Sequence, residues 1–157
     1  MKLYIAGPDV FRPDARQWAE GVHAACRAAG HEALIPLDGE ATTAQAIYAS
    51  NIAMIAAADV VLANLDPFRG AEPDSGTAFE VGYALALGKR VIGYVSEGLL
   101  QAERVAAWQG HPLQLGENGP QDAAGRLVEN FGLPLNLMLA VPARIVVGGL
   151  TEALTAL

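Results

Sequence analysis

Short apolar segments that alternate with helical segments constrain the fold of this chain more than any other feature. The apolar segments are KLYIAG, HEALIPLDG, DVVLANLD and RVIGYVS. Between them lie ARQWAEGVHAACRAAG, TTAQAIYASNIAMIAAAD and TAFEVGYALALGK, in which apolar residues recur at helical spacing. Strands joined through helices form a parallel sheet covered on both faces, because right-handed crossovers place the helices there. The sequence therefore predicts a Rossmann-like or flavodoxin-like α/β fold, and a length of 157 residues favours a single domain over 1–157.

The helical and strand patterns are weaker after the fourth apolar segment. We predict a helix in EGLLQAERVAAWQG, a polar loop in HPLQLGENGPQ and a further helix in QDAAGRLVENFG, where Leu127, Val128 and Phe131 have helical spacing. The last stretch, PLNLMLAVPARIVVGGLTEALTAL, begins with an apolar run and ends in a short helix with Thr151 as its predicted N-cap. Asp14 is the predicted N-cap of the first helix.

Composition limits where the protein acts and what it binds. Hydrophobic residues make up 52% of the chain and charged residues 17%, so we expect apolar surface to be buried between subunits of a homo-oligomer. A net charge of −7 disfavours nucleic acid polymers as partners. The apolar run in MKLYIAGPDVF is too short for a signal peptide, and no apolar run of about 18 residues occurs, so we expect a cytoplasmic protein without membrane contact. Cys26 is the only cysteine and is interpreted as a small buried hydrophobe.

Three loops are candidate ligand sites, because ligands of open α/β sheets bind beyond the carboxyl ends of the strands. They are residues 6–13, 37–43 and 66–77, and only the last is dense in polar groups. The chain has no G-x-G-x-x-G, Walker lysine or G-x-S-x-G motif. Its histidines show no H-x-x-x-H spacing and no pairing with cysteine. We therefore predict neither a metal nor an organic cofactor.

The segment PDSGTAFEVGYALALGK, residues 73–89, carries two carboxylates around the start of a predicted helix. Thr77 and Glu80 fit a capping box, in which the Thr hydroxyl and the Glu carboxylate bond the amides of the helix end. Glu80 also fits a nucleophile at a sugar carbon, with Asp74 as the acid that exchanges a proton with the leaving group. These residues alone leave both interpretations open. A place in the first turn of a helix favours the ionised carboxylate, so we expect Glu80 to be charged.

Three motifs, taken together, resemble the nucleoside 2-deoxyribosyltransferase family. They are YIAGPDVF at the start, NLDPFRG followed by DSGTAFEVGYALALGK in the middle, and PLNLM toward the end, and the similarity runs from Leu3 to about Leu139. The resemblance implies an enzyme of nucleoside salvage that transfers 2-deoxyribose between nucleobases of 2′-deoxynucleosides without a cofactor. It also implies a dimer-based homo-oligomer whose partners are deoxynucleosides and free nucleobases.

The resemblance also implies roles for individual residues. Glu80, in the E-x-G-x-A segment, is the expected nucleophile on the anomeric carbon, Asp74 is expected to contact and help protonate the base, and Tyr4 to hold the nucleophile in place. Asn136, in the N-L-M segment, is expected to bind the sugar 5′-hydroxyl in a neighbouring subunit's site. The other expected substrate contacts are Gly7, Phe11, Asn51, Phe68, Gly76 and Met138. Phe68 fits a stack on the base as well as a cover over the core.

The chain departs from the family pattern at Asn51, where well-studied members have an Asp that contacts the base, and at Leu157, where members often end in a carboxylate or an aromatic residue. An amide both donates and accepts, so the preferred base does not follow from the sequence. Two other functions stay open. One is an N-glycosidase that uses water on nucleosides or 5′-monophosphates. The other is a non-enzymatic, flavodoxin-like receiver or ligand-sensing domain, in which Asp9, Asp66 and Lys89 take the roles of a phosphoryl receiver.

Overall fold

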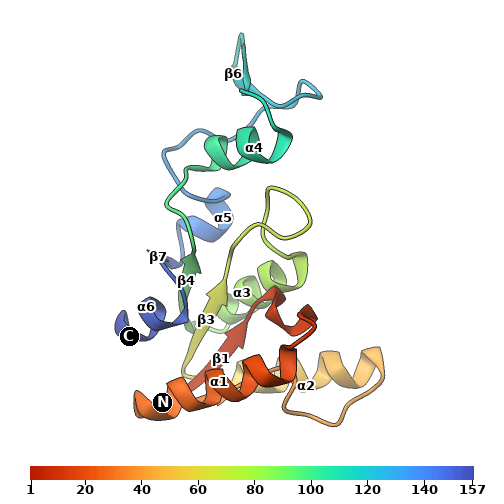
Figure 1. Cartoon of the computed structure of the whole chain (residues 1–157), viewed down its shortest axis with the longest axis vertical. Helices are drawn as coiled ribbons and strands as arrows, with labels where there is room; N and C mark the ends of the chain where they lie inside the picture. Colours follow the sequence, from red (N-terminus) through yellow and green to blue (C-terminus); the bar gives the residue numbers. More distant parts are fainter.

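A five-stranded parallel sheet forms the centre of the computed structural model, which describes all 157 residues (Figure 1). The strand order is β2-β1-β3-β4-β7, with β1 at Lys2–Ala6, β2 at Glu32–Leu34, β3 at Val60–Asn64, β4 at Arg90–Val95 and β7 at Arg144–Val147. All neighbouring pairs are parallel. The chain passes from β1 outward to β2 and then returns to the other side of β1, so the topological switch point lies between β1 and β3. The predicted α/β architecture is confirmed.

Helices cover both faces of the sheet. One face carries α2 (Ala44–Ala57), α3 (Ser75–Ala86) and α5 (Leu137–Ala140), and the other carries α1 (Ala15–Ala28) and α6 (Leu150–Thr155). Tyr4 and Ala6 of β1 pack on the first face. Leu3 and Ile5 pack on the second, because successive strand residues point to opposite sides. Cys26 is buried in this second core, where burial raises the pKa of its thiol.

An arm extends beyond the carboxyl ends of the strands. It contains α4 (Gln101–Gln109) and two short antiparallel strands, β5 (Gln114–Gly116) and β6 (Gly119–Gln121), at the end of the molecule furthest from the N-terminus (Figure 1). The helix predicted in EGLLQAERVAAWQG is confirmed by α4. The helix predicted in QDAAGRLVENFG is wrong, because the Asp122 carboxylate accepts hydrogen bonds from the N–H groups of Ala124 and Arg126 and closes a turn there. None of the helices in the fold has the length and apolarity needed to cross a membrane.

A missed strand, a helix start and a helix cap also differ from the sequence predictions. RIVV forms the edge strand β7, which was missed because a short apolar run does not separate strand from helix. The last helix begins after Gly149 and not after Thr151, and the Glu152 carboxylate accepts the Gly149 N–H at 2.7 Å. Asp14 stands at the N-cap position of α1, but its carboxylate pairs with Arg12 instead of the helix amides.

Candidate active site

Asp74 caps the start of α3. Its Oδ2 accepts hydrogen bonds from the Thr77 N–H at 2.9 Å and from the Thr77 hydroxyl at 3.0 Å. The capping box of Thr77 and Glu80 is therefore wrong, because the helix begins at Ser75 and Thr77 donates to the cap instead of forming it. Gly76 lies close to this cap, since a Cβ there would come within 3.0 Å of Asp74 Oδ2. Glu80 takes no part in capping the start of α3.

Glu80 instead bonds to the first strand of the sheet. The Tyr4 hydroxyl donates to Glu80 Oε1 at 2.6 Å. The Tyr4 side chain is fully buried, so the surrounding core fixes the donor and thereby the carboxylate. The two residues lie 76 positions apart, and they meet because α3 packs on the face of β1 that carries Tyr4. Two of the predicted catalytic residues thus form one bonded pair.

The surroundings of this pair change the acidity of both groups. Burial raises the pKa of Glu80 from 4.5 to about 6; the Tyr4 hydrogen bond lowers it, the Asp74 charge raises it, and Asn51 lowers it as a hydrogen-bond donor. Burial, followed by the Glu80 charge, raises the pKa of Tyr4, so the phenol stays protonated. The expected place of Glu80 in the first turn of a helix is wrong, because the residue lies in the second turn of α3, and burial raises its pKa. With a pKa of about 6 the carboxylate is still mostly ionised at neutral pH.

Glu80 lines a pocket of about 460 Å³, a volume suited to a small molecule. The pocket lies among the loop after β1, the loop after β2 and the start of α3. Predicted site residues that line it are Gly7, Phe11, Asn51, Asp74, Gly76 and Glu80. Gly7 is required by close packing, because a Cβ there would lie 2.9 Å from the Cβ of Asn64. All three candidate loops, 6–13, 37–43 and 66–77, therefore meet at one site, as the strand-end rule predicts.

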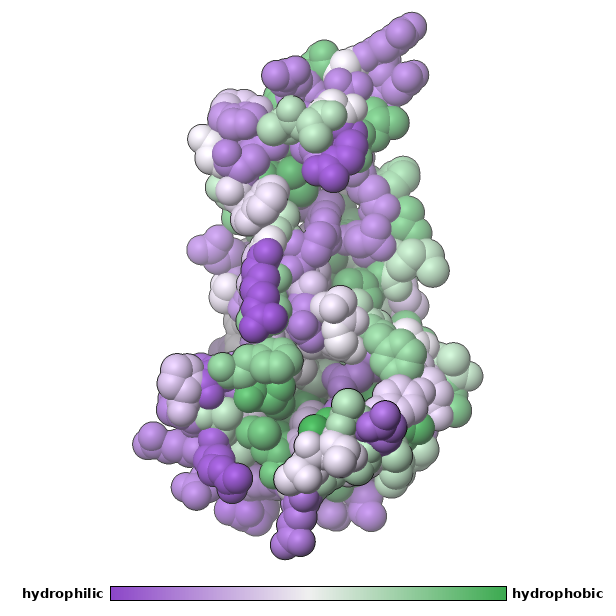
Figure 2. All heavy atoms as spheres, turned by 90° about the vertical axis from the view of Figure 1, so that its right-hand side faces the viewer, coloured by the Kyte–Doolittle hydropathy of each residue, from purple (hydrophilic) through white to green (hydrophobic).

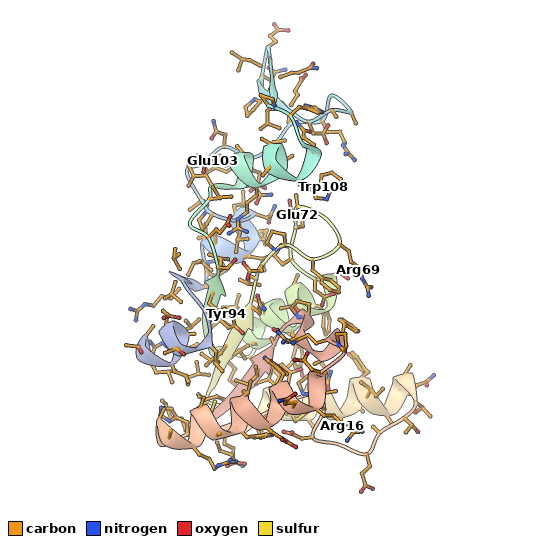
Figure 3. The ribbon with its side chains drawn as sticks, in the orientation of Figure 1. Arg16, Arg69, Glu72, Tyr94, Glu103 and Trp108 are labelled. Carbon is orange, nitrogen blue, oxygen red and sulfur yellow. The ribbon has the colours of Figure 1, made fainter.

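Phe68 does not line the pocket but supports a residue that does. Its ring stacks on Phe11, with the centroids 5.6 Å apart and the planes at 15°. The guanidinium of Arg69 lies 4.6 Å from the Phe68 centroid, on the loop between β3 and α3 (Figure 3). Phe68 thus neither lines the pocket nor covers the core. It packs against Phe11, which does line the pocket.

Asn136 and Met138 do not reach the pocket of their own chain. Asn136 caps α5, where its Oδ1 accepts the Met138 N–H at 3.0 Å and its Nδ2 donates to Glu129 Oε1 at 2.8 Å. The Met138 side chain is 72% exposed. Both residues line a separate hollow beside Glu72 and Pro73. A substrate contact of either residue therefore requires a second subunit.

Among the pocket residues that were not selected from the sequence, two come from helices outside the three candidate loops and α3. Arg16 lines the pocket from the first turn of α1, and Ile47 lines it from the first turn of α2. An isoleucine in an apolar helix carries no signal of function. Arg16 does carry one, because a cation in the first turn of a helix faces the positive end of the helix dipole.

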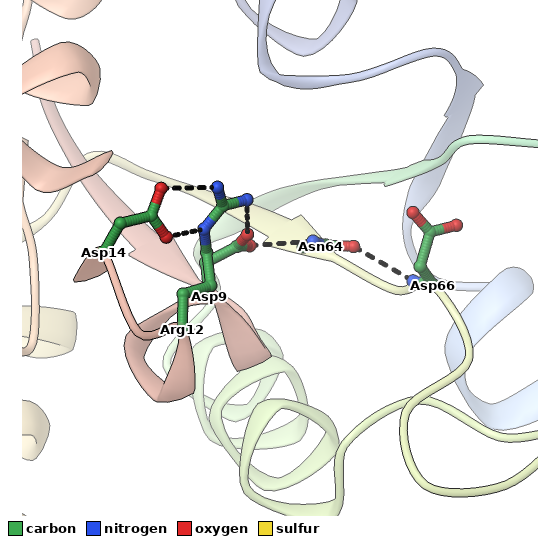
Figure 4. Close-up of polar contacts among 5 residues, drawn as sticks. All are labelled: Asp9, Arg12, Asp14, Asn64 and Asp66. Atoms are coloured by element: carbon green, nitrogen blue, oxygen red, sulfur yellow. Dashed lines mark hydrogen bonds and ion pairs between the residues drawn. The ribbon is translucent and has the colours of Figure 1, made fainter. Parts of the chain in front are cut away.

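A polar network lies at the carboxyl ends of β1 and β3, at the switch point (Figure 4). Asp9 accepts from Asn64 Nδ2 at 2.8 Å and forms an ion pair with Arg12 at 3.7 Å. The Asp66 N–H donates to Asn64 Oδ1 at 3.1 Å, and the Asp66 carboxylate accepts from the Ser96 hydroxyl. These acids are therefore already bonded within the chain.

The position of Lys89 contradicts the interpretation of the chain as a phosphoryl receiver. This residue directly precedes β4, and its Nζ donates to the carbonyl oxygens of Ala56 and Ala58 at 2.8 Å each. Lys89 therefore lies at the amino ends of the parallel strands, whereas Asp9 and Asp66 lie at the carboxyl ends. A lysine there cannot act with carboxylates at the carboxyl ends of the strands.

Comparison with known proteins identifies the family. The family model of nucleoside 2-deoxyribosyltransferases matches residues 3–138, which include Tyr4, the pocket and all of α3. The chain belongs to this family. The resemblance seen in the sequence is thereby confirmed, and the protein is an enzyme of the deoxyribosyltransferase kind, whose members act on nucleosides and nucleobases.

The chain is also similar to solved structures and to a curated relative. A 2-desoxiribosyltransferase from Leishmania mexicana is 39% identical with a TM-score of 0.82, and 99% of this chain and 95% of that chain are covered. A 2-deoxyribosyltransferase from Bacillus psychrosaccharolyticus shares the fold at 21% identity and a TM-score of 0.51, with 69% of this chain and 82% of that chain covered. An uncharacterized protein of Schizosaccharomyces pombe is 33% identical, with 87% of this chain and 74% of its own length covered.

Replacement of Tyr4 by Phe is expected to move the acid limb of the kcat/KM profile to higher pH. The hydrogen bond from Tyr4 lowers the pKa of Glu80, so its loss raises that pKa further above its present value of about 6. A hydrogen bond to a charged group corresponds to a shift of about one pH unit. We expect turnover to need the ionised Glu80 carboxylate, so turnover should fall most at mildly acidic pH. Profiles of the wild type, Tyr4→Phe and the exposed control Tyr48→Phe measure the shift, and an unmoved limb in Tyr4→Phe would show that the bond does not tune Glu80.

Proposed function

We propose that the enzyme transfers 2-deoxyribose between nucleobases by a double displacement. Glu80 attacks C1′ of a 2′-deoxynucleoside, the bond from C1′ to the base nitrogen breaks, and the base leaves with a proton that Asp74 helps to supply. A deoxyribosyl ester of Glu80 remains. A second base then attacks C1′, returns its proton to Asp74 and releases the Glu80 carboxylate. Since each displacement inverts C1′, the sugar keeps its configuration overall.

The observation that carries this proposal is the Glu80 carboxylate, held by a buried phenol at 2.6 Å in the pocket that Asp74 also lines. A carboxylate nucleophile must be ionised and fixed in position, and the Tyr4 bond favours both. The Leishmania mexicana structure, named a 2-desoxiribosyltransferase at 39% identity, supports the same reaction. A carboxylate in contact with C1′ also lies beside C2′, where a 2′-hydroxyl would crowd it. We therefore infer a preference for 2′-deoxy sugars.

One incubation tests the reaction. The protein is mixed with deoxyinosine, with and without free adenine, and the products are separated by chromatography. Transfer predicts deoxyadenosine and hypoxanthine in equal amounts when adenine is present. Hypoxanthine with free deoxyribose, and no deoxyadenosine, would identify an N-glycosidase and reject the transferase. Inosine in place of deoxyinosine is expected to react far more slowly.

We also propose that the site is completed by a second copy of the chain in a dimer-based homo-oligomer. Asn136 begins α5, and the apolar side chains of Met138 and Val141 on that segment are 72% and 70% exposed. Phe79, which precedes Glu80 in the sequence, is 51% exposed, and its ring stacks on that of Tyr83. Figure 2 shows further hydrophobic surface on the body of the molecule. Burial of these side chains against a second subunit would bring Asn136 to the neighbouring pocket.

Mixing two impaired variants is expected to restore activity if the site is shared. Glu80→Gln lacks the nucleophile, and Asn136→Ser keeps a capping side chain for α5 but loses the amide. Half of randomly re-formed dimers are hybrids with one intact site each, so turnover should approach about a quarter of the wild-type value. Assays after co-refolding, with each variant refolded alone as control, measure this. A mixture no more active than the mean of its components would contradict a shared site.

A further inference from the structure

The pocket gives a nucleobase apolar walls and two polar side chains that neither the proposed chemistry nor the helix cap uses. The apolar walls come from Val10, Phe11, Pro36, Leu37 and Ile47. A flat base places its faces against such walls and its edges toward polar groups. With the sugar carbon at Glu80, the polar side chains left for the base edge are Arg16 and Asn51.

Arg16 is a cation that the fold leaves without a partner. Its guanidinium forms no hydrogen bond or ion pair within the chain, and the nearby carboxylate of Asp14 is paired with Arg12. It lies in the first turn of α1, next to the loop between β2 and α2 that also lines the pocket (Figure 3). Arg16 is exposed and lines the pocket, so its guanidinium, unfavourably placed at a helix start, is free to bind a ligand.

Asn51 presents the complementary group. Its Oδ1 is buried and has no hydrogen-bond partner in the chain. The amide's NH₂ group is the side that can donate to a carboxylate, and Asn51 as a donor lowers the pKa of Glu80. A buried acceptor without a partner is unfavourable in the free protein, and an N–H of a bound base restores the missing bond.

From these two groups we propose that the pocket selects nucleobases with a carbonyl beside a ring N–H, as in hypoxanthine, guanine, thymine and uracil. Arg16 has donors only, so it bonds a carbonyl but leaves an exocyclic amino group unpaired, while Asn51 Oδ1 accepts the ring N–H. Adenine and cytosine place an amino group beside a ring nitrogen that carries no hydrogen. A donor then stands where the oxo bases have an acceptor, and an acceptor stands where they have a donor. Arg16 is then a specificity residue of the deoxyribosyl transfer, and this inference rests on the function proposed above.

The test compares two donors that differ at this edge. Base release from deoxyinosine and from deoxyadenosine is followed with thymine as the common acceptor, and kcat/KM is measured for each. Inhibition by free hypoxanthine and free adenine separates recognition of the base from its quality as a leaving group. The wild type is expected to favour the oxo base by at least about tenfold in both measurements. Arg16→Met keeps the aliphatic stem without the donors and is expected to bring both ratios to within about twofold of one.

Arg27→Met is the matched control, because Arg27 is exposed on the same helix and does not line the pocket. It should keep the wild-type ratios. Base exchange without a preference for oxo bases, or a preference that Arg16→Met leaves intact, overturns the specificity while the transferase function stands. A folded wild-type protein that releases and exchanges no base at all overturns both.

Discussion

Glu80→Gln is expected to slow base exchange by at least about a thousandfold. Glutamine has nearly the shape of glutamate, and its carbonyl oxygen still accepts the Tyr4 hydrogen bond, so the pocket keeps its form. The neutral amide oxygen cannot displace a base from C1′, and only binding and positioning remain. The measurement is single-turnover exchange between deoxyinosine and adenine. In parallel, mass spectrometry of the acid-quenched wild type should find one deoxyribosyl group on the peptide that contains Glu80, and none on the variant.

A stability measurement separates this loss from misfolding. The pKa of Glu80 is raised from 4.5 to about 6 in the folded protein, so the folded state binds its proton more tightly than the unfolded state does. The stabilisation from that proton is present below the ordinary pKa and is lost as the pH rises toward 6. At neutral pH the wild type therefore holds an unfavourable half-buried charge, and Glu80→Gln should unfold with a free energy about 1–2 kcal/mol higher.

The stability difference should disappear at acid pH, where the carboxyl group is protonated. Glu20→Gln, at an exposed position of α1, is the control and should change neither stability nor exchange. A Glu80→Gln protein that is stable yet exchanges bases at a near-normal rate would remove Glu80 from the mechanism.

The alternation of apolar runs and helical segments was sufficient to predict the sheet, because each run is buried on both faces and each helix must cross back over it. The prediction failed where local composition allows two outcomes. RIVV is too short for its periodicity to reveal the strand β7. QDAAGRLVENFG has apolar residues at helical spacing, but Gly125 with φ of 78° and the Asp122 carboxylate stabilise a turn instead.

The site was predicted in part, and its missing parts depend on contacts between distant segments. Local sequence could not choose among Asp74, Ser75 and Thr77 as the cap of α3, since each has a suitable side-chain oxygen. The direction of the Glu80 pKa shift follows from burial against the sheet, which is not visible along the chain. Arg16 comes to the pocket only because β1 pairs with β2 and brings the loop after β2 beside α1. The sequence thus indicates which residues can cap, bind or react, whereas the strand pairing determines which of them lie together in the site.

Asp74 caps α3, and we propose that it also helps to protonate the departing base; two substitutions separate these functions. Asp74→Asn keeps an oxygen that accepts the Thr77 N–H, but it removes the carboxyl group that helps to protonate the departing base. Base release should then slow by about 10²- to 10⁴-fold while the free energy of unfolding stays close to the wild-type value. Asp74→Ala loses the cap as well, which should lower the free energy of unfolding by about 1 kcal/mol.

The choice of substrate makes this prediction specific to proton transfer. The electron-withdrawing fluorine of 5-fluoro-2′-deoxyuridine stabilises the anion of its base, which therefore departs with less need of a proton than the base of 2′-deoxyuridine. Asp74→Asn should lose less activity on the fluorinated substrate, whereas Glu80→Gln should lose the same on both, because an ionised nucleophile is needed in either case. Kinetics of both nucleosides, with thermal unfolding of each variant, test this directly. Equal rates of Asp74→Asn and wild type on both substrates, together with a less stable Asp74→Ala, would leave Asp74 as a helix cap without a part in the chemistry.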